Sequence, residues 1–219
     1  MPEINLLERY PTSKRSTADR GPAITEEVRA VARQYGRDYF DGDRRYGYGG
    51  YSYHPRFWQE TVRLFHDHYG LADDASVLDV GCAKGFMLHD FKRLYPGMTV
   101  AGIDISEYAI ANAIETMRPF VRVGDAKQLP FPDRSFDLVT AINTIHNLPL
   151  EECKEALREI QRVSRGNSFI VVDAWTNDEE RERMKDWVVT ARTYMHVDDW
   201  RGVFEEVGYT GDNYWFIVG

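Results

Sequence analysis

A glycine-bearing turn is the part of this sequence whose residue types point most directly to chemistry. In residues 77–85, a run that can form a buried strand leads into a turn containing Gly81 and Gly85, and a helical segment begins at Phe86. Glycines let the backbone approach a ligand closely, and the N-terminus of a helix offers it unpaired N–H groups. The arrangement is typical of a nucleotide-cofactor site, although the two glycines alone could equally be turn residues.

Three aspartates at regular intervals strengthen this interpretation. Asp104 lies about 20 residues beyond the glycine turn, where a carboxylate can hydrogen-bond a ribose diol. Asp125 follows at a similar interval and could accept the exocyclic amine of an adenine, while Ala126 offers its backbone N–H to the ring. Asp79 lies inside the first strand, where a carboxylate is costly unless it is paired or hydrogen-bonded. It could orient the turn, or meet a ligand's ammonium group through water.

Two alternatives stay open from this spacing. Asp104 could simply cap the helix that follows it. The pattern up to Asp104 fits a nicotinamide dinucleotide as well as S-adenosylmethionine, but the dinucleotide leaves the motif at Asp125 unexplained.

From residue 76 onward the sequence alternates between strand and helix patterns. Apolar strands such as residues 169–172 indicate burial on both faces, and hence a mostly parallel sheet. The alternation predicts a doubly wound α/β fold, Rossmann-like, with a shortened antiparallel edge formed by a last strand at 213–218. We expect the other strands at 76–80, 99–104, 121–123, 138–142 and 168–172, and helices at 86–95, 107–116, 151–164, 179–194 and 197–207.

The N-terminal quarter differs in character, and we expect a separate segment at 1–54 ahead of a cofactor-binding domain at 55–219. Residues 1–22 are polar with Pro and Gly, and predict a loose arm. Helical spacing predicts one helix over 25–39, with Thr25 as its N-cap, and a second that Pro55 opens and Gly70 ends. Between them lies a tract that could be a mobile aromatic lid or a surface loop packed on its own tyrosines: Tyr46, Tyr48, Tyr51 and Tyr53.

Composition narrows the function classes. The 219 residues include 27 basic and 35 acidic side chains, and the net charge of −8 disfavours a nucleic-acid partner. We find no apolar run long enough to span a membrane and no secretory signal, so we expect a cytoplasmic protein without membrane attachment. Cys82 and Cys153 predict reduced thiols, with neither a disulfide framework nor metal-ligand spacing. The oligomeric state stays open.

As a set, five segments resemble the class I S-adenosylmethionine-dependent methyltransferases, over roughly residues 55–219: 77–85, 101–106, 124–131, 136–148 and 157–173. The resemblance implies S-adenosylmethionine as methyl donor and S-adenosylhomocysteine as product. It implies that Asp104 binds the ribose with Ile105 against the adenine, and that Asp125 and Ala126 bind the adenine. It also implies a backbone contact at Asn143 near the methionine part, which the loop residues Asp79, Gly81, Cys82, Ala83 and Gly85 wrap. Ala83 stands where many members have a second loop glycine.

The segment after the fourth strand bears on the methyl acceptor. It lacks the Asn/Asp-Pro-Pro-aromatic motif that grips nucleobase or glutamine amines, and looks like the histidine-containing loop of small-molecule methyltransferases. His146 could deprotonate a hydroxyl or amine, because the pKa of histidine lies near working pH, or it could only shape the pocket beside Asn147. We therefore expect methyl transfer to oxygen or nitrogen of a small metabolite, without a metal. The alternatives are methylation of a protein side chain, or a non-catalytic S-adenosylmethionine-binding module.

Overall fold

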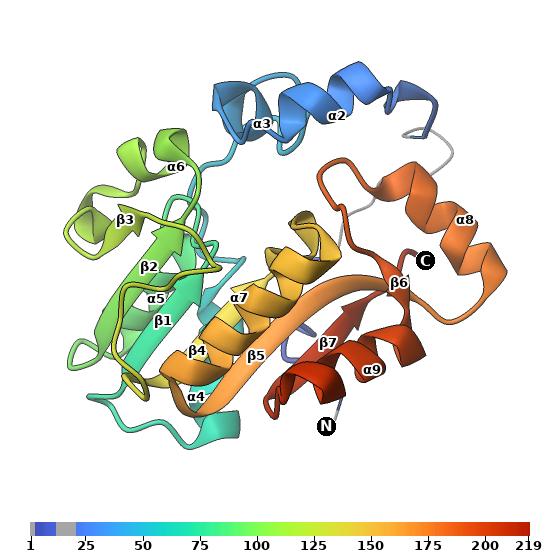
Figure 1. The fold of residues 1–219 in the computed structure, drawn as a ribbon. Coiled ribbons are helices and arrows are strands. Elements are labelled where there is room, and N and C mark those ends of the chain that lie inside the picture. Colours follow the sequence, from blue (N-terminus) through green and yellow to red (C-terminus); the bar gives the residue numbers. More distant parts are fainter. Residues whose placement is uncertain (1–2, 12–20) are drawn as a thin grey trace.

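A parallel β-sheet forms the centre of the molecule in the computed structural model, which describes residues 3–11 and 21–219. The strand order across the described sheet is β3-β2-β1-β4-β5-β6, and β7 also pairs with β5 (Figure 1). Every pairing between the described strands is parallel. The strands are β1 (Ser76–Val80), β2 (Thr99–Asp104), β3 (Val121–Val123), β4 (Phe136–Ile142), β5 (Ser164–Trp175), β6 (Met195–His196) and β7 (Asp212–Phe216).

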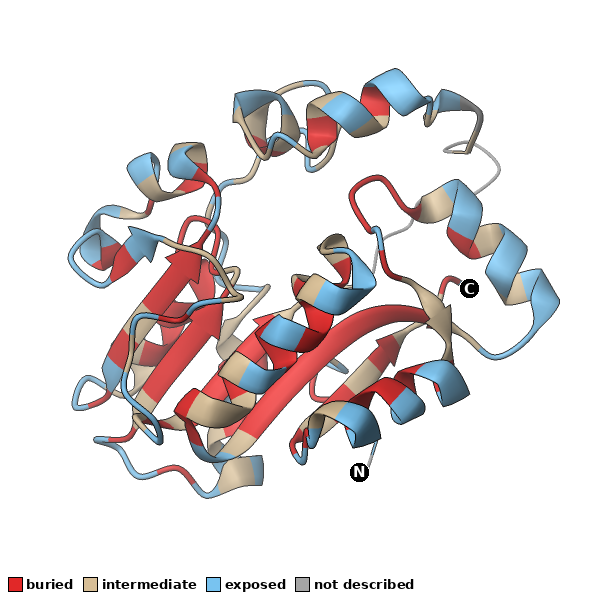
Figure 2. Ribbon diagram, in the orientation of Figure 1, coloured by how far each residue is buried: buried red, intermediate tan, exposed pale blue. Residues whose placement is uncertain are grey.

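Helices cover both faces of this sheet (Figure 1). Successive residues of a strand point to opposite faces, so Val77 and Leu78 of β1 belong to two different hydrophobic cores. The central strands are buried along most of their length, as Figure 2 shows. The doubly wound, mostly parallel α/β fold predicted from the sequence is therefore confirmed. The helices against Val77 are α4 (Gln59–Tyr69) and α5 (Phe86–Leu94), and those against Leu78 are α7 (Leu150–Val163) and α9 (Val197–Val207).

The C-terminal edge of the sheet differs from the expectation. We predicted an antiparallel closing strand, but β7 runs parallel to β5, with Tyr214 opposite Val171. The reason lies in the connection, because α9 carries the chain back along the sheet before β7 begins. The last strand therefore starts at the amino end of the sheet, as in other strand–helix–strand units.

The predicted helix over 25–39 is two helices. Thr25 caps the first as expected, with its Oγ1 accepting the backbone N–H of Val28 at 3.2 Å. Tyr35 then adopts a left-handed φ of 50°, which an α-helix cannot accommodate. The two helices are α2 (Glu26–Ala32) and α3 (Arg37–Asp41).

The predicted helix over 179–194 also ends early. It stops as α8 (Asp178–Trp187), and the three residues that follow, Val188, Val189 and Thr190, are β-branched and lose side-chain freedom in a helix. Residues 188–194 form an irregular connection to β6 instead. The remaining short elements are α6 (Glu107–Ala111), which is shorter than predicted, and the 3-10 helices η1 (Gly21–Ala23), η2 (Glu115–Met117) and η3 (Ile145–Asn147).

The expected loose arm at 1–22 is wrong for the part that the structure describes. Glu3 bridges to Asn213 of β7, and the backbone N–H of Ile4 donates to the carbonyl of Asn213 at 2.9 Å. Leu6 is buried in the same core as α4 and α5. Residues 3–7 are therefore held in place by the backbone bridge to β7 and by the burial of Leu6. Residues 1–2 and 12–20 of the predicted arm lie outside the described part.

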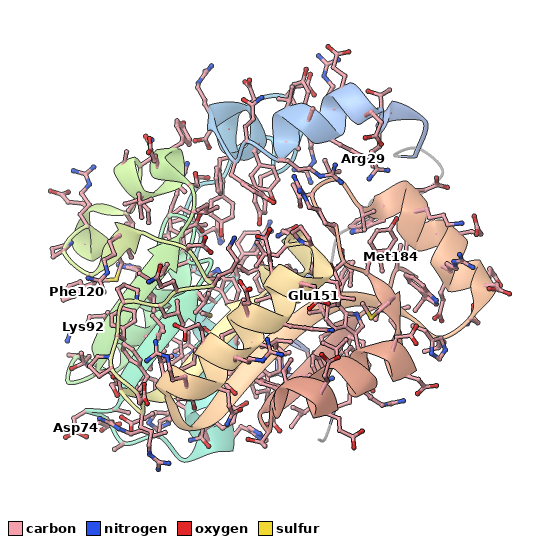
Figure 3. The ribbon with its side chains drawn as sticks, viewed as in Figure 1. Arg29, Asp74, Lys92, Phe120, Glu151 and Met184 are labelled. Atoms are coloured by element: carbon pink, nitrogen blue, oxygen red, sulfur yellow. The ribbon has the colours of Figure 1, made fainter. Side chains whose placement is uncertain are left out.

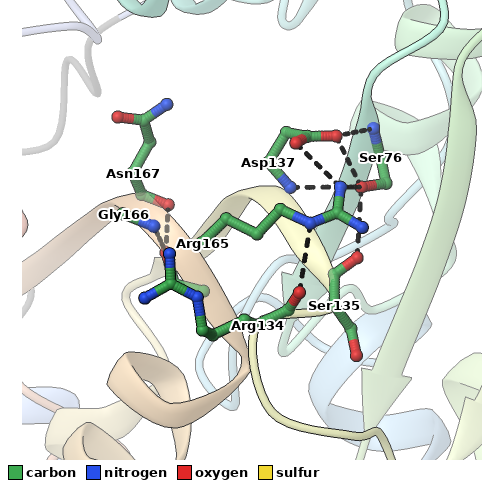
Figure 4. Close-up of polar contacts among 8 residues, drawn as sticks. Ser76, Arg134, Ser135, Asp137, Arg165, Gly166 and Asn167 are labelled. Carbon is green, nitrogen blue, oxygen red and sulfur yellow. Dashed lines mark hydrogen bonds and ion pairs between the residues drawn. The ribbon is translucent and has the colours of Figure 1, made fainter.

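A polar cluster closes the amino end of the sheet (Figure 4). Oδ2 of Asp137 accepts the backbone N–H and the hydroxyl of Ser76 at 2.8 and 2.7 Å, while Nη1 of Arg165 lies 2.8 Å from Oδ1 of Asp137. The cluster ties β1, β4 and β5 together. Most of the predicted site residues lie at the opposite, carboxyl edge of the sheet.

Candidate functional site

A cavity of about 340 Å³ opens at the carboxyl ends of β1, β2, β3 and β4. Ligands of open α/β sheets bind at this edge, where the strand order reverses, and here β1 lies between β2 and β4. The predicted cofactor residues that line the cavity are Gly81, Ala83, Asp104, Ile105, Asp125, Ala126 and Asn143. Those that do not line it are Asp79, Cys82 and Gly85.

The turn after β1 owes its shape to glycine. Gly81 has a φ of 84°, and a Cβ there would lie 2.0 Å from Oγ1 of Thr144. Gly85, with a φ of 78°, is the N-cap of α5. Ala83 holds a left-handed φ of 48° although it is not glycine. The backbone of this turn therefore lines the cavity at Gly81 and Ala83, and α5 begins just behind it at Gly85, outside the lining.

Asp104 fixes the second wall of the cavity. Its Oδ2 accepts the backbone N–H of Ala83 at 2.7 Å, and its Oδ1 accepts the backbone N–H of Ser106 at 2.8 Å. Burial raises the pKa of Asp104, and the two N–H groups act in the opposite direction. The alternative that Asp104 caps the next helix is wrong, because the N-cap of α6 is Ser106, whose hydroxyl accepts the backbone N–H of Ala109 at 2.9 Å. The Asp104 carboxylate holds only the Ser106 N–H ahead of that helix. It also lines the cavity, where each oxygen has a further lone pair to offer a ribose hydroxyl.

The residues predicted to bind the adenine lie just beyond β3. Oδ1 of Asp125 accepts the backbone N–H of Lys127 at 2.9 Å, which shapes this short turn. The side chain of Lys127 forms ion pairs with Glu152 at 2.6 Å and with Asp125 at 3.6 Å. Ile105 is 56% exposed and lines the cavity beside this group, so it offers an apolar surface to a flat ring. The arrangement suits an adenine.

Asp79 and Cys82 support the cavity without lining it. Asp79 is buried in β1, where its Oδ1 accepts the hydroxyl of Thr140 at 2.9 Å. Burial raises the pKa of Asp79 to about 7. The thiol of Cys82 is buried, packs against Gly102 of β2 and has a pKa raised by that burial. Both side chains position the turn.

The N-terminal segment covers the cavity, but mostly with residues that the sequence did not single out. Of the four lid tyrosines only Tyr48 lines the cavity. Tyr51 instead stacks on Phe86 with ring centroids 5.0 Å apart, and the hydroxyl of Tyr53 donates to Asp90 at 2.7 Å. The missed lining residues from this segment are Arg33, Tyr35, Tyr39 and Phe40. Helical spacing placed Tyr35 on a core face, and only the Gly36 that follows it hinted at a break.

Two hydrogen bonds fasten this segment to either side of the cavity. The hydroxyl of Ser106 donates to the backbone carbonyl of Tyr35 at 2.5 Å, next to Asp104. On the other side, Nη1 of Arg29 donates to the carbonyl of Val188 at 2.5 Å. Figure 3 shows Arg29 reaching from α2 toward the connection after α8. The cover is therefore anchored on both flanks in this conformation.

His146, predicted as a general base, does not line the cavity. Its Nδ1 accepts the backbone N–H of Asp173 at 2.9 Å, which places the ring proton on Nε2 and leaves neither nitrogen free to accept another. Burial lowers the pKa of His146, and Asp173 acts in the opposite direction. The backbone carbonyl of His146 accepts the N–H groups of Arg192 and Thr193, each at 2.9 Å. His146 as general base therefore stays a prediction: its Nδ1 is occupied by the Asp173 N–H, and the bonds to Arg192 and Thr193 are made by its backbone carbonyl and not by the ring.

Asn147, the neighbour of His146, does line the cavity. Its side-chain nitrogen donates to the backbone carbonyl of Asn143 at 3.0 Å. Its Oδ1 is buried and has no hydrogen-bond partner among the described residues. A buried acceptor of this kind is costly unless a ligand supplies a donor. Asn147 is thus a lining residue after β4 whose side chain has an unused acceptor.

Metal binding and membrane crossing were the wider questions raised by the sequence. In the described residues, no group of three or more histidine, cysteine, aspartate or glutamate side chains could hold a metal ion. No helix within that part of the chain combines the length and apolar character needed to cross a bilayer.

Comparison with known proteins agrees with the geometry of the cavity. A profile that describes a methyltransferase domain matches residues 78–172. An uncharacterized protein from Haemophilus influenzae is 30% identical over 152 residues, which make up 64% of this chain and 60% of that protein. The sterol 24-C-methyltransferase erg6 from Aspergillus fumigatus is 33% identical over 192 residues, 73% of this chain and 49% of that protein. The chain thus spans only about half to three-fifths of the length of these relatives.

Solved structures show the same fold. The crystal structure of the YcgJ protein from Bacillus subtilis matches with a TM-score of 0.51 at 20% identity, over 67% of this chain and 66% of that one. The region matched by the methyltransferase profile contains most of β1 to β5, and the carboxyl ends of β1 to β4 carry the cavity.

Proposed function

The chain belongs to the class I S-adenosylmethionine-dependent methyltransferases, and on this premise we propose that it transfers a methyl group to oxygen or nitrogen of a small molecule. The observation that carries the proposal is the convergence of Gly81, Asp104 and Asp125 on one cavity at the carboxyl edge of the sheet. Three separate strands supply these residues, so their meeting is a property of the fold and not of one motif.

The residues present fit S-adenosylmethionine. Gly81 keeps the turn clear of side-chain atoms, Asp104 offers lone pairs to two ribose hydroxyls, and Asp125 with Ile105 suits the adenine. The start of α5 and the backbone near Asn143 would hold the methionine part. When bound, this cofactor supplies a methyl group activated by a sulfonium charge.

The acceptor side of the cavity supports a small molecule that carries a hydrogen-bond donor. Asn147 offers its unpartnered Oδ1 to the N–H or O–H of the acceptor, and so orients it. The rings of Tyr39, Phe40 and Tyr48 line the same cavity and offer an apolar surface to the acceptor. The sterol 24-C-methyltransferase, which matches 73% of this chain, is named for a small molecule and for a carbon atom, so it supports the small-molecule class of the acceptor and not the choice of oxygen or nitrogen.

The chain's own contribution to rate is positioning. Methyl transfer is an in-line displacement, and holding two reactants in line can supply several kcal/mol of the barrier, on the order of 7–11 kcal/mol in the best cases. With the His146 ring occupied by Asp173, Asn147 and the aromatic cover are the groups that would fix the acceptor. We assign them the positioning role, with no dedicated base.

Transfer of a labelled methyl group tests this proposal. The protein is incubated with S-adenosylmethionine labelled in its methyl group, together with either a small-metabolite extract or a protein extract. We expect S-adenosylhomocysteine to form and label to enter the small-molecule fraction, while Asp104→Ala gives neither. Label confined to proteins would favour the side-chain alternative. Cofactor binding without any transfer to either extract would favour a non-catalytic module.

A further inference from the structure

Two arginines line the cavity from segments that pack against each other. Arg33 and Arg192 both line it, although they come from segments far apart in the chain. Nε and Nη2 of Arg33 donate to the backbone carbonyls of Thr190 and Ala191, each at 3.4 Å. The side chain of Arg33 therefore lies against the backbone that leads directly into Arg192.

The position of Arg192 is fixed on the acceptor side. Its backbone N–H donates to the carbonyl of His146 at 2.9 Å, and the hydroxyl of Thr193 donates to the carbonyl of Leu148 at 2.7 Å. Both bonds tie the 188–194 connection to the loop after β4. This loop also carries Asn147. It follows β4, which is separated from β3 and Asp125 by β1 and β2 in the sheet.

The acidic residues of the cavity lie elsewhere. Its lining carboxylates belong to Asp104 at the end of β2, to Asp125 after β3, and to Glu152, which pairs with Lys127 at 2.6 Å. Within residues 3–11 and 21–219, no carboxylate forms an ion pair with Arg33 or Arg192. The carboxylates of Asp104 and Asp125 thus lie at the β2–β3 end, and that of Glu152, in the first turn of α7, is paired with Lys127, so the two arginines keep positive charge that no lining carboxylate in the described part of the chain neutralises.

Tyr35 lines the same cavity as both arginines. Burial raises the pKa of its phenol to about 12, while Arg192 and Arg33 act to lower it and Asp104 to raise it. The phenol thus lies within electrostatic reach of both arginines and of Asp104. Two like charges in one partly enclosed space repel each other, and a bound anion removes that cost.

From this arrangement we infer that Arg33 and Arg192 form a binding site for a carboxylate group of the methyl acceptor. The inference rests on the proposed function, because it names the chemical class of the acceptor for the same cavity. Guanidinium groups bind carboxylates through paired N–H donors, which gives both charge and direction. The methionine carboxylate of the cofactor has the same chemistry. The anchoring of Arg192 next to Asn147, the residue assigned to the acceptor, favours the acceptor.

A matched pair of probes tests the inference. Protein saturated with S-adenosylhomocysteine is titrated calorimetrically with 4-hydroxybenzoate and with its neutral amide, 4-hydroxybenzamide. We expect the wild type to bind the acid more tightly than the amide. In Arg192→Gln the ratio of the two affinities should fall about tenfold or more, which is the size of effect expected when a hydrogen bond to a charged group is lost. Arg192→Lys keeps the charge but not the paired donors, and should retain part of it. Arg37→Gln, which removes a charge from α3 outside the cavity, should retain all of it.

The arms of this experiment separate the sources of the carboxylate. If Arg192→Gln weakens S-adenosylhomocysteine tenfold but leaves 5′-methylthioadenosine unaffected, the site serves the cofactor and the inference is overturned. Equal or undetectable binding of both probes by the wild type also overturns it, as does an unchanged preference in the variant. Arg33→Gln gives a second variant should Arg192→Gln fail to fold. Failure of the proposed function is distinct, since it appears as absent binding of S-adenosylhomocysteine to the wild type.

Discussion

The side-chain nitrogen of Lys84, in the turn after β1, lies 2.6 Å from Oδ2 of Asp41 at the end of α3. Lys84 is buried, and it also donates to the backbone carbonyl of Tyr51 at 2.8 Å. Asp41 in turn accepts the backbone N–H of Tyr51 at 2.9 Å and the hydroxyl of Tyr108 at 2.8 Å. This ion pair joins the segment that covers the cavity to the turn that would hold the cofactor.

Removing the acid of this pair should loosen the cover. Asp41→Asn should lower the free energy of unfolding by about 1–2 kcal/mol, since it weakens a partly exposed pair but leaves Lys84 buried. Limited proteolysis should cut faster within residues 24–54. Asp43→Asn, which removes an exposed acid from the same segment, is the control. Equal cleavage rates in the two variants would rule out an anchoring role for the pair.

The ion pair between Lys84 and Asp41 should also be lost at low pH. Burial acts to raise the pKa of Asp41, but hydrogen bonds from Lys84, Tyr51 and Tyr108 outweigh it and leave the pKa below its ordinary value. A lowered pKa contributes stability that is present above about pH 4, the unfolded value, and is lost as pH falls through the folded value. Proteolysis of the wild type should therefore approach that of Asp41→Asn only below about pH 4.

Asp79 gives the opposite pH dependence. Burial raises its pKa to about 7, so it contributes stability that is full below the unfolded pKa and is lost as pH rises through about 7. Asp79→Asn can still accept the Thr140 hydroxyl but cannot ionise. In urea unfolding, the stability of the wild type relative to Asp79→Asn should fall between about pH 4 and 7. Parallel profiles for the two proteins would mean that Asp79 titrates as an ordinary aspartate.

His146 offers a test of positioning against base catalysis. The substitution His146→Asn places an amide oxygen near the position of Nδ1, where it can accept the Asp173 N–H but cannot take up a proton. We expect turnover within about tenfold of the wild type, whereas loss of a general base costs roughly 10²–10⁴-fold. His146→Ala should lower both stability and turnover, since it leaves the Asp173 N–H unpaired. A large loss of turnover in a stable His146→Asn protein would restore the base hypothesis.

Gly81 tests how tightly the turn approaches the loop after β4. Gly81→Ala should cost clearly more stability than Gly70→Ala, although both glycines have a positive φ, of 84° and 56°. A Cβ at Gly70 meets nothing within 4 Å, so only backbone strain of about 1 kcal/mol is expected there. The further substitution Thr144→Gly should recover part of the loss in Gly81→Ala. If thermal unfolding shows equal losses for both glycines, the close contact does not exist in solution.

The carboxyl edge of the sheet was the part most predictable from sequence. Gly81, Asp104 and Asp125 each lie at or just beyond the end of a strand, and parallel strands bring their carboxyl ends to one edge regardless of loop detail. The parallel sheet itself followed from the same alternation. Local pattern and tertiary structure agree here because burial on both faces fixes the strands.

The cover of the cavity was not predictable in the same way. Tyr35 and Tyr39 have helical spacing, yet a left-handed φ at Tyr35 turns the chain over the sheet. Arg192 lies within the predicted helix over 179–194, and hydrogen bonds from the connection at 188–194 to His146 and Leu148 bring it to the cavity. The orientation of β7 likewise depends on where α9 returns the chain. The cover of the cavity, the place of Arg192 and the direction of β7 depend on contacts between segments far apart in the sequence, and local residue patterns do not predict such contacts.

Calorimetric titration with S-adenosylhomocysteine, its 2′-deoxyribose analogue and NAD tests the central claim most directly. Asp104 should accept hydrogen bonds from the ribose, and each such bond to a charged group is worth about 1.5–3 kcal/mol. The wild type should therefore bind S-adenosylhomocysteine about tenfold or more tightly than the deoxy analogue, and NAD should not compete. In Asp104→Ala this preference should vanish, whatever the variant does to the turn. Tighter binding of NAD, or a preference that persists in Asp104→Ala, would contradict the account.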